Sequence, residues 1–207
     1  MELIKIVITG GPCGGKSSAA ESIRSVFAPK GYTVLFVSET ATELIRGGVA
    51  PWTCGTTAEY QACLMKLQLK KEDVFEEAAA TMGAEKVLLV CDRGALDSKA
   101  YMTEEEFQRE IRAMGQTEQA LLHRYHAVFH LVSAAKGAEC FYTTDNNSAR
   151  TETPTQAADL DDRALEAWKE HPYCYKIEPA PNFGEKLNRL TDTIQSFLQA
   201  SERAMYK

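Results

Sequence analysis

A run of residues near the N-terminus has the composition and spacing of a phosphate-binding loop. Gly10 to Ser17 reads Gly-Gly-Pro-Cys-Gly-Gly-Lys-Ser and matches the pattern G-x-x-x-x-G-K-[ST]. Glycines let backbone N–H groups turn inward around a phosphate, and the helix that follows adds unpaired donors. In this pattern Lys16 places its charge on the β- and γ-phosphates, and Ser17 offers a hydroxyl to Mg²⁺. The predicted nucleotide-binding residues are Gly10, Gly11, Pro12, Cys13, Gly14, Gly15, Lys16, Ser17 and Ser18.

A carboxylate and an arginine end the third apolar run of the chain. Asp92 closes the run that begins at Lys86, where a carboxylate can orient the shell of a magnesium ion beside the loop. The guanidinium of Arg93 suits a phosphate or the charge that develops during phosphoryl transfer, and a surface ion pair is the alternative. Asp97 is either a substrate ligand or an ordinary helix acid. We therefore predict metal binding by Ser17 and Asp92 and a catalytic role for Arg93.

Glu39 follows the second apolar run in the same way. In open α/β sheets, ligands bind at the carboxyl ends of the strands, where Lys16, Glu39 and Asp92 all fall. A carboxylate there can accept the proton of an attacking hydroxyl, or it can hydrogen-bond the acceptor. The alternative is an N-cap acid for the helix that follows. We predict catalytic roles for Lys16 and Glu39, with Glu39 and Asp97 on the substrate side.

A long polar segment interrupts the regular pattern. Residues 134–156 are rich in turn-forming residue types, and a loop of this length inside a domain is usually a functional lid or a disordered segment. Arg150 lies within it, and an arginine that closes over phosphates excludes water and stabilises charge. Solvated surface charge is the alternative. We predict a lid over about residues 134–156 and a catalytic role for Arg150.

Strand and helix signals alternate along the chain and would position these residues. Strands are expected over residues 2–9, 33–38, 86–92, 127–133 and 173–178. Helices are expected over 17–27, near 39, and after the capping pairs Thr56 and Glu59, Thr103 and Glu106, and Asn182 and Glu185. The helix after Thr56 is expected to bury a stripe of Tyr60, Cys63, Leu64, Leu67, Val74 and Phe75. This alternation predicts an α/β fold with a parallel sheet flanked by helices.

Composition excludes several classes of function. The chain has 207 residues, which fits one domain over residues 1–207. It carries 29 acidic and 23 basic residues, a formal charge of −6 that argues against broad contact with nucleic acid. The longest apolar runs are strand-sized, so no membrane span and no signal peptide are expected. The 6 scattered cysteines are typical of reduced thiols in a cytoplasmic protein.

Segments 6–17, 37–45, 91–97 and 147–152 occur in an order that resembles a known family. They are similar to AAA-domain proteins grouped with nicotinamide-riboside-kinase-like P-loop proteins, including the N-terminal domain of an insect photoreceptor-channel trafficking protein. The resemblance implies a nucleoside/nucleotide-kinase-like P-loop NTPase fold with a five-stranded parallel sheet of order 2-3-1-4-5. It also implies phosphate binding by residues 10–18, a magnesium role for Asp92, an acceptor-side role for Glu39 and a lid role for Arg150.

Together these features predict transfer of the γ-phosphate of ATP or GTP to a small-molecule acceptor, with Mg²⁺ as cofactor. The alternative is an ATP- or GTP-binding regulatory or trafficking module with little turnover. The Asn-Lys-x-Asp signature typical of GTPases does not occur in the sequence. Kinase-like folds read the base in other ways, so the choice between ATP and GTP stays open, as do the acceptor and the oligomeric state. A AAA+ motor is not expected, because the chain leaves no room for a separate C-terminal helical domain.

Overall fold

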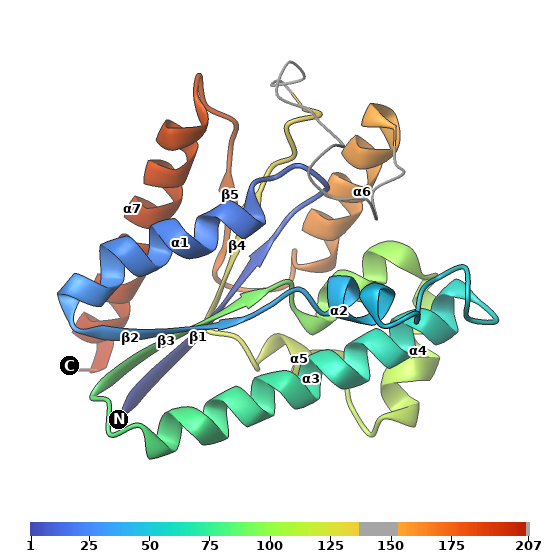
Figure 1. Cartoon of the computed structure of the whole chain (residues 1–207), viewed down its shortest axis with the longest axis horizontal. Coiled ribbons are helices and arrows are strands. Elements are labelled where there is room, and N and C mark those ends of the chain that lie inside the picture. The colour runs from blue at the N-terminus through green and yellow to red at the C-terminus, as the bar shows by residue number, and fades with distance from the viewer. Residues whose placement is uncertain (137–152, 206–207) are drawn as a thin grey trace.

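A parallel sheet forms the centre of the molecule (Figure 1). The computed structural model describes residues 1–136 and 153–205. The strands are β1 (Glu2–Thr9), β2 (Tyr32–Val37), β3 (Lys86–Asp92), β4 (Ala127–Leu131) and β5 (Cys174–Ile177). They pair in the order β2-β3-β1-β4-β5, and every pair is parallel. This topology confirms the predicted α/β class and the sheet order 2-3-1-4-5 that the family resemblance implied.

Two helices cover one face of the sheet. They are α1 (Lys16–Phe27) and α7 (Phe183–Met205), which lie side by side in Figure 1, and the short helix η1 (Ala28–Lys30) follows α1. Ile6 and Ile8 of β1 point to this face and pack with Phe27 of α1 and with Leu190 and Phe197 of α7. Successive residues of a strand point to opposite faces, so an uninterrupted apolar strand requires helices on both sides.

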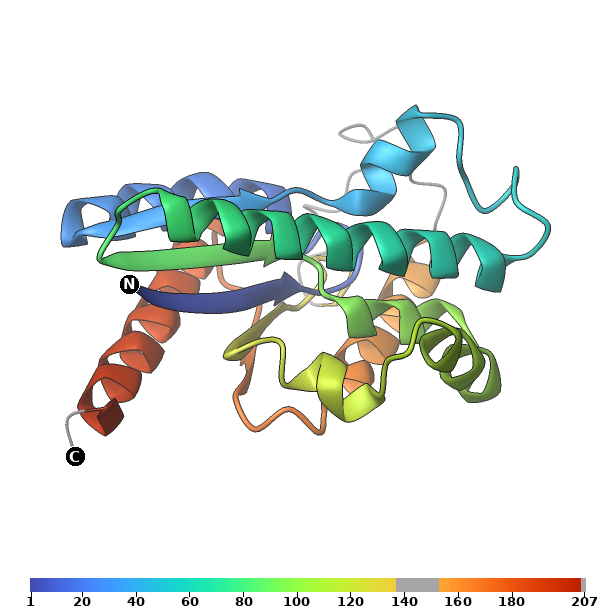
Figure 2. The same cartoon turned by 90° about the horizontal axis from the view of Figure 1, so that it is seen from below.

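The opposite face is covered by two longer helices, α3 and α6, and by the shorter helices between them in the chain. They are α3 (Thr57–Thr81), η2 (Ala95–Tyr101), α4 (Glu104–Ala113), α5 (Glu118–Leu122) and α6 (Pro154–Ala167). Val7 of β1 points to this side and packs in one core with Met65 of α3, Phe107 of α4 and Trp168 at the end of α6. Figure 2 shows α3 running along the direction of the strands, with its N-terminal end at the same end of the molecule as α2 (Thr40–Arg46).

The helix starts agree with the capping pairs in the sequence. The hydroxyl oxygen of Thr56 accepts a hydrogen bond from the N–H of Glu59 at 3.1 Å, at the start of α3. Thr103 and Glu106 cap each other reciprocally at α4, and the N–H of Glu185 donates to Asn182 Oδ1 at 2.8 Å at α7. Within the described part of the chain, no helix is both long enough and apolar enough to cross a membrane.

Two features differ from expectation. The predicted loop over 134–156 ends early, because Thr153 caps α6 and the helix begins at Pro154. The predicted apolar stripe of α3 is also wrong in part, since Cys63 and Val74 are exposed. The buried face carries Glu72 instead.

A polar network explains that burial. Glu72 is fully buried and accepts hydrogen bonds from Lys5 Nζ at 3.3 Å, Arg124 Nε at 3.2 Å and Tyr125 Oη at 2.8 Å. A buried carboxylate is tolerated when cations and donors satisfy it.

Candidate functional site

The predicted phosphate-binding loop connects the end of β1 to the start of α1. At Gly10 the backbone has φ +135°, and a side chain there would overlap the backbone oxygen of Leu131 in β4. Gly15, immediately before α1, has φ +91°. Glycine adopts both conformations freely because it has no Cβ. The loop therefore turns tightly over the end of β4 and presents the N-terminus of α1, where the hydroxyl-bearing residues Ser17 and Ser18 are exposed.

Lys16, the first residue of α1, turns its side chain back onto this loop. Its Nζ donates to the carbonyl oxygens of Gly10 at 3.0 Å and Gly11 at 2.9 Å. Burial, followed by the nearby charge of Arg93, lowers the pKa of Lys16 to about 8, although neighbouring carboxylates oppose the shift. At neutral pH the ammonium is therefore charged and poorly hydrated. In such surroundings its attraction for a polyphosphate is stronger than in bulk water.

Parallel pairing brings Glu39, Asp92 and Arg93 to the same edge of the sheet as this lysine. β1 and β3 pair so that Ile8 lies beside Asp92, and the N–H of Arg93 donates to the carbonyl oxygen of Ile8 at 3.0 Å. β2 lies on the other side of β3 and leads to Glu39. Arg93 Nε lies 3.2 Å from Glu39 Oε1. Residues from three strand ends thus form one charged group around Lys16.

Asp92 has the properties of a metal-orienting carboxylate. Its Oδ1 is buried and has no hydrogen-bond partner among the described residues. Burial raises the pKa of Asp92 to about 6, with Lys16 and Arg93 opposing the shift and Glu39 and Asp97 adding to it. Buried carboxylate oxygens are normally hydrogen-bonded, and Mg²⁺ prefers oxygen ligands, so this oxygen and the hydroxyl of Ser17 fit a magnesium ion.

Glu39 occupies the N-cap position of α2, but its side chain caps no backbone N–H. Its carboxylate instead accepts a hydrogen bond from Thr42 Oγ1 at 2.6 Å and faces Arg93. Burial alone would raise the pKa of Glu39, yet the charges of Arg93 and Lys16 outweigh it and hold the value at about 2. The carboxylate is therefore ionised throughout the neutral range, and the helix-capping alternative is not what the structure shows.

Arg93 is held in an uncommon backbone conformation. Its φ is +70°, in the left-handed region that most residue types avoid. Hydrogen bonds on both sides fix it there: the N–H donates to Ile8, and the carbonyl oxygen accepts from Gln68 Nε2 at 3.2 Å. Such conformations persist only where the surroundings enforce them, and they cluster at functional sites. Here the result is a guanidinium that points at Glu39 and Asp97.

Asp97 is buried, and both of its oxygens are engaged. Oδ1 accepts from the hydroxyl of Thr9 and lies 3.5 Å from Arg93 Nη1. Oδ2 accepts from the N–H of Gly94 at 2.8 Å and from Trp168 Nε1 at 3.3 Å. These contacts tie the start of η2 to β1 and to the end of α6. A substrate role for Asp97 stays a prediction.

A cleft of about 350 Å³ opens directly from this charged group. Lys16, Glu39 and Arg93 line one part of it, and the other walls come mainly from α2, the loop after α2, the N-terminal part of α3, and η2. Most of that remaining wall is apolar, with Ile45, Trp52, Tyr60, Leu64 and Tyr101 among its residues. A pocket of this size with polar groups gathered at one end is typical of small-molecule sites.

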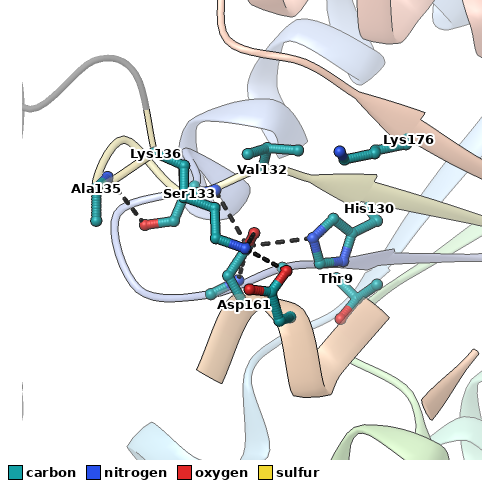
Figure 3. Close-up of polar contacts among 12 residues, drawn as sticks. Thr9, His130, Val132, Ser133, Ala135, Lys136, Asp161 and Lys176 are labelled. Carbon is teal, nitrogen blue, oxygen red and sulfur yellow. Dashed lines mark hydrogen bonds and ion pairs between the residues drawn. The ribbon is translucent and has the colours of Figure 1, made fainter. Parts of the chain in front are cut away.

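Sequence reasoning missed the residues that support the loop from the other side. The N–H of Gly11 donates to Asp161 Oδ1 at 2.7 Å, and the N–H of Ser133 donates to the same oxygen at 3.0 Å. Figure 3 shows the Asp161 carboxylate between Ser133 and His130, whose Nε2 lies 3.1 Å from Oδ1 at ion-pair distance but without hydrogen-bond geometry. In the sequence Asp161 is followed by Asp162 and belongs to no recognisable motif, so no local pattern predicts its role.

Lys186 provides similar support from α7. Its Nζ donates to the carbonyl oxygens of Gly14 at 2.8 Å and Val132 at 2.6 Å, and burial lowers the pKa of Lys186 to about 8. The predicted catalytic residue Arg150, and residues 137–152 of the predicted lid, lie outside the described residues.

The parallel sheet, the glycine-rich loop and the lysine and hydroxyl residues at the start of α1 define a P-loop NTPase fold. A family model described as "AAA domain" matches residues 5–186, so the chain belongs to this AAA-domain family. The match indicates nucleotide binding. Among curated proteins, none matches the chain.

Proposed function

We propose that this protein is a magnesium-dependent phosphotransferase that moves the γ-phosphate of ATP or GTP onto a hydroxyl of a small acceptor in the cleft. The observation that carries the proposal is that Lys16, Glu39 and Arg93 line the cleft together. An acceptor bound there would lie beside the terminal phosphate that Lys16 contacts. The resemblance to nicotinamide-riboside-kinase-like proteins supports the same reaction class.

The residues suit a reaction that depends on positioning and charge stabilisation. The N–H groups of the P-loop and the ammonium of Lys16 would bind the phosphates. Ser17 and Asp92 would hold the Mg²⁺, which when bound supplies positive charge to the β- and γ-phosphate oxygens. Arg93 adds a permanent cation at the boundary between the phosphates and the cleft, because its guanidinium stays protonated at any physiological pH.

Glu39 would position the acceptor hydroxyl. A group with a pKa of about 2 is a weak base, so its carboxylate would accept a hydrogen bond from the hydroxyl without keeping the proton. The proton would pass to an oxygen of the transferred phosphoryl group as the new P–O bond forms and the bond to the nucleoside diphosphate breaks. Arg93 and Thr42 hold that carboxylate in place from two sides. The attacking oxygen would then be oriented toward the phosphate, which is the main contribution a protein makes to this transfer.

The test is nucleotide consumption and product mass across a panel of nucleosides, vitamins, sugars and their monophosphates. Glu39→Gln should keep nucleotide affinity and lower transfer by roughly 10²-fold or more. Glu43→Gln is the matched control, since Glu43 lies one turn after Glu39 in α2 but pairs with Lys71 at 2.5 Å and does not line the cleft. Equal loss of nucleotide affinity in Glu39→Gln and Asp92→Asn would contradict an acceptor-side role. Tight binding without turnover would favour the regulatory or trafficking module.

A further inference from the structure

In the described part of the cleft wall, the cationic side chains lie at the P-loop end. Among the described residues that line it, the cationic side chains are Lys16 and Arg93. Lys16 is bonded to loop carbonyl oxygens, and Arg93 is already paired with Glu39 at 3.2 Å and Asp97 at 3.5 Å. Apart from Lys16, Glu39, Arg93 and Asp97, the lining residues that the structure describes are uncharged. An acceptor that carried its own phosphate would bring a dianion toward two carboxylates, with no further cation from the described wall to compensate for desolvation.

The uncharged wall contains hydroxyl groups that lack partners. Tyr60 Oη and Ser98 Oγ belong to side chains that are each 2% exposed, and neither has a hydrogen-bond partner among the described residues. Neighbouring hydroxyls of the same wall are satisfied: Thr40 bonds Gln68 at 2.5 Å, and Thr42 bonds Glu39. Buried polar groups are normally paired, so the unpaired ones mark where a ligand heteroatom would be recognised.

Aromatic side chains provide the flat part of the wall. Trp52, in the loop between α2 and α3, lines the cleft although it is 68% exposed, while Tyr60 is buried in the first turn of α3. A solvent-exposed tryptophan at the rim of a cleft offers a large rigid face for a planar ring. Burial and then the charge of Glu39 raise the pKa of Tyr60 to about 12, so its hydroxyl keeps its proton and can donate.

We propose that the acceptor is an uncharged alcohol that carries a planar ring with hydrogen-bonding heteroatoms, rather than a phosphorylated compound. The ring lies against Trp52 and Tyr60, its heteroatoms bond Tyr60 and Ser98, and its hydroxyl points toward Lys16 and Glu39. This inference rests on the proposed phosphotransferase function, and it narrows the acceptor from any hydroxyl-bearing or phosphorylated molecule to one chemical class.

Calorimetry in the presence of a non-hydrolysable Mg-nucleotide tests the class directly. Uridine and pyridoxine are the ring alcohols, uridine monophosphate and pyridoxine phosphate are their phosphorylated forms, and ribose lacks the aromatic ring. At least one ring alcohol should bind, and its phosphorylated form and ribose should bind at least about tenfold more weakly. Tighter binding of the monophosphates, or no binding of either ring alcohol, would overturn the proposal.

Cleft variants locate the binding. Trp52→Ala and Tyr60→Phe should each weaken ring-alcohol binding by about five- to tenfold and leave Mg-nucleotide affinity unchanged. Tyr32→Phe is the matched control, because Tyr32 Oη bonds Glu202 at 3.3 Å and Tyr32 does not line the cleft. Unchanged binding in both cleft variants would place the ligand elsewhere and overturn the proposal.

Product analysis separates this inference from the proposed function. Binding of a ring alcohol that is sensitive to Trp52 and Tyr60, without formation of its phosphate ester, would support the ligand class and contradict phosphotransfer. Phosphorylation of ribose or of the monophosphates alone would support phosphotransfer and overturn the ligand class.

Discussion

Two carboxylates lie on opposite sides of the phosphate-binding loop, and the protein holds them in opposite ways. Asp161, on α6, accepts hydrogen bonds from the N–H groups of Gly11 and Ser133, and its Oδ2 lies 3.3 Å from Lys136 Nζ. Asp92, at the end of β3, has an Oδ1 without any hydrogen-bond partner in the described part of the chain. Both carboxylates are largely buried, yet among the described residues Asp161 has partners for both oxygens and Asp92 Oδ1 has none.

The pKa values follow from this difference. Burial raises the pKa of both groups, but at Asp161 the nearby His130 and the N–H of Gly11 outweigh it and hold the value at about 2. At Asp92 burial dominates and the value is about 6. A carboxylate that is saturated by backbone donors fixes the shape of a loop. One that the protein leaves unsatisfied is available to a cation, so we assign a structural role to Asp161 and propose a metal-binding role for Asp92.

The largest effect is expected from removing the saturated carboxylate. Asp161→Ala leaves two buried N–H groups without their acceptor, removes one of the two carboxylates that pair with Lys136, and should lower the free energy of unfolding by about 3–5 kcal/mol. Chemical denaturation measures this change. Asp162→Ala is the control on the same helix, because its side chain is 71% exposed and its pairing with Lys136 should contribute less than about 1 kcal/mol. Equal unfolding midpoints for the two variants would contradict a structural role for Asp161.

Removal of the Lys16 side chain should lower nucleotide affinity rather than the free energy of unfolding. Lys16→Ala should reduce nucleotide affinity or turnover on the order of 10³-fold, because the phosphates lose a preorganised charge, while the unfolding midpoint stays near that of the wild type. Calorimetry with Mg-ATP and Mg-GTP measures the affinity. If affinity and turnover were unchanged in Lys16→Ala, the P-loop assignment would be wrong.

Neutralising the unsatisfied carboxylate should produce a smaller and metal-specific effect. Asp92→Asn should weaken Mg²⁺-dependent nucleotide binding by about 10- to 100-fold, because the ion loses the charge that orients its shell. The free energy of unfolding should not fall, since Asp92 Oδ1 makes no hydrogen bond that the variant could lose. Nucleotide titrations at several Mg²⁺ concentrations are the measurement. A loss of stability like that of Asp161→Ala would remove the distinction between the two carboxylates.

The smallest effect is expected from pH. Lys16 has a pKa of about 8 in the free protein, and bound phosphates must raise it, so nucleotide binding takes up a proton above pH 8. Affinity should therefore fall by up to about tenfold per pH unit as the pH rises above 8. Asp92 and Asp161 are already ionised at that pH and add no slope.

Lys186 must be separated from Lys16 in this experiment, because its pKa is also about 8. An arginine stays charged over the whole range. Lys16→Arg should therefore flatten the pH profile, while Lys186→Arg should keep its slope. If Lys186→Arg flattened the pH profile and Lys16→Arg kept its slope, the titrating proton would belong to Lys186.

Structural features that depend on residues close together in the chain could be predicted from the sequence. The P-loop pattern, the apolar strands and the pairs Thr56–Glu59, Thr103–Glu106 and Asn182–Glu185 all lie within a few residues, and the structure confirms them. The meeting of Lys16, Glu39 and Asp92 at one edge was predictable for a different reason. Parallel strands all end at the same edge of a sheet, so residues that follow strands gather there.

Helical periodicity gave a partly wrong prediction for the buried face of α3, because that face includes polar residues. The predicted α3 stripe consists of apolar residues, but the buried face also contains Glu72 and Gln68, which bond with partners from β1, α2 and the segment before β4. A sequence pattern ranks a buried glutamate as exposed because its compensating cations come from elsewhere in the chain.

By itself, therefore, the sequence determined the α/β class, the phosphate-binding loop and the edge of the sheet at which the charged residues gather. Only the tertiary structure decided that Asp161 fastens Gly11, 150 residues away, and that Arg93 pairs with Glu39, 54 residues away. It also decided that Asp92 Oδ1, beside the P-loop, and Tyr60 Oη and Ser98 Oγ, in the cleft wall, have no hydrogen-bond partner among the described residues. Whether a buried polar group is satisfied depends on distant segments that packing brings within about 3 Å, and no local pattern records that distance.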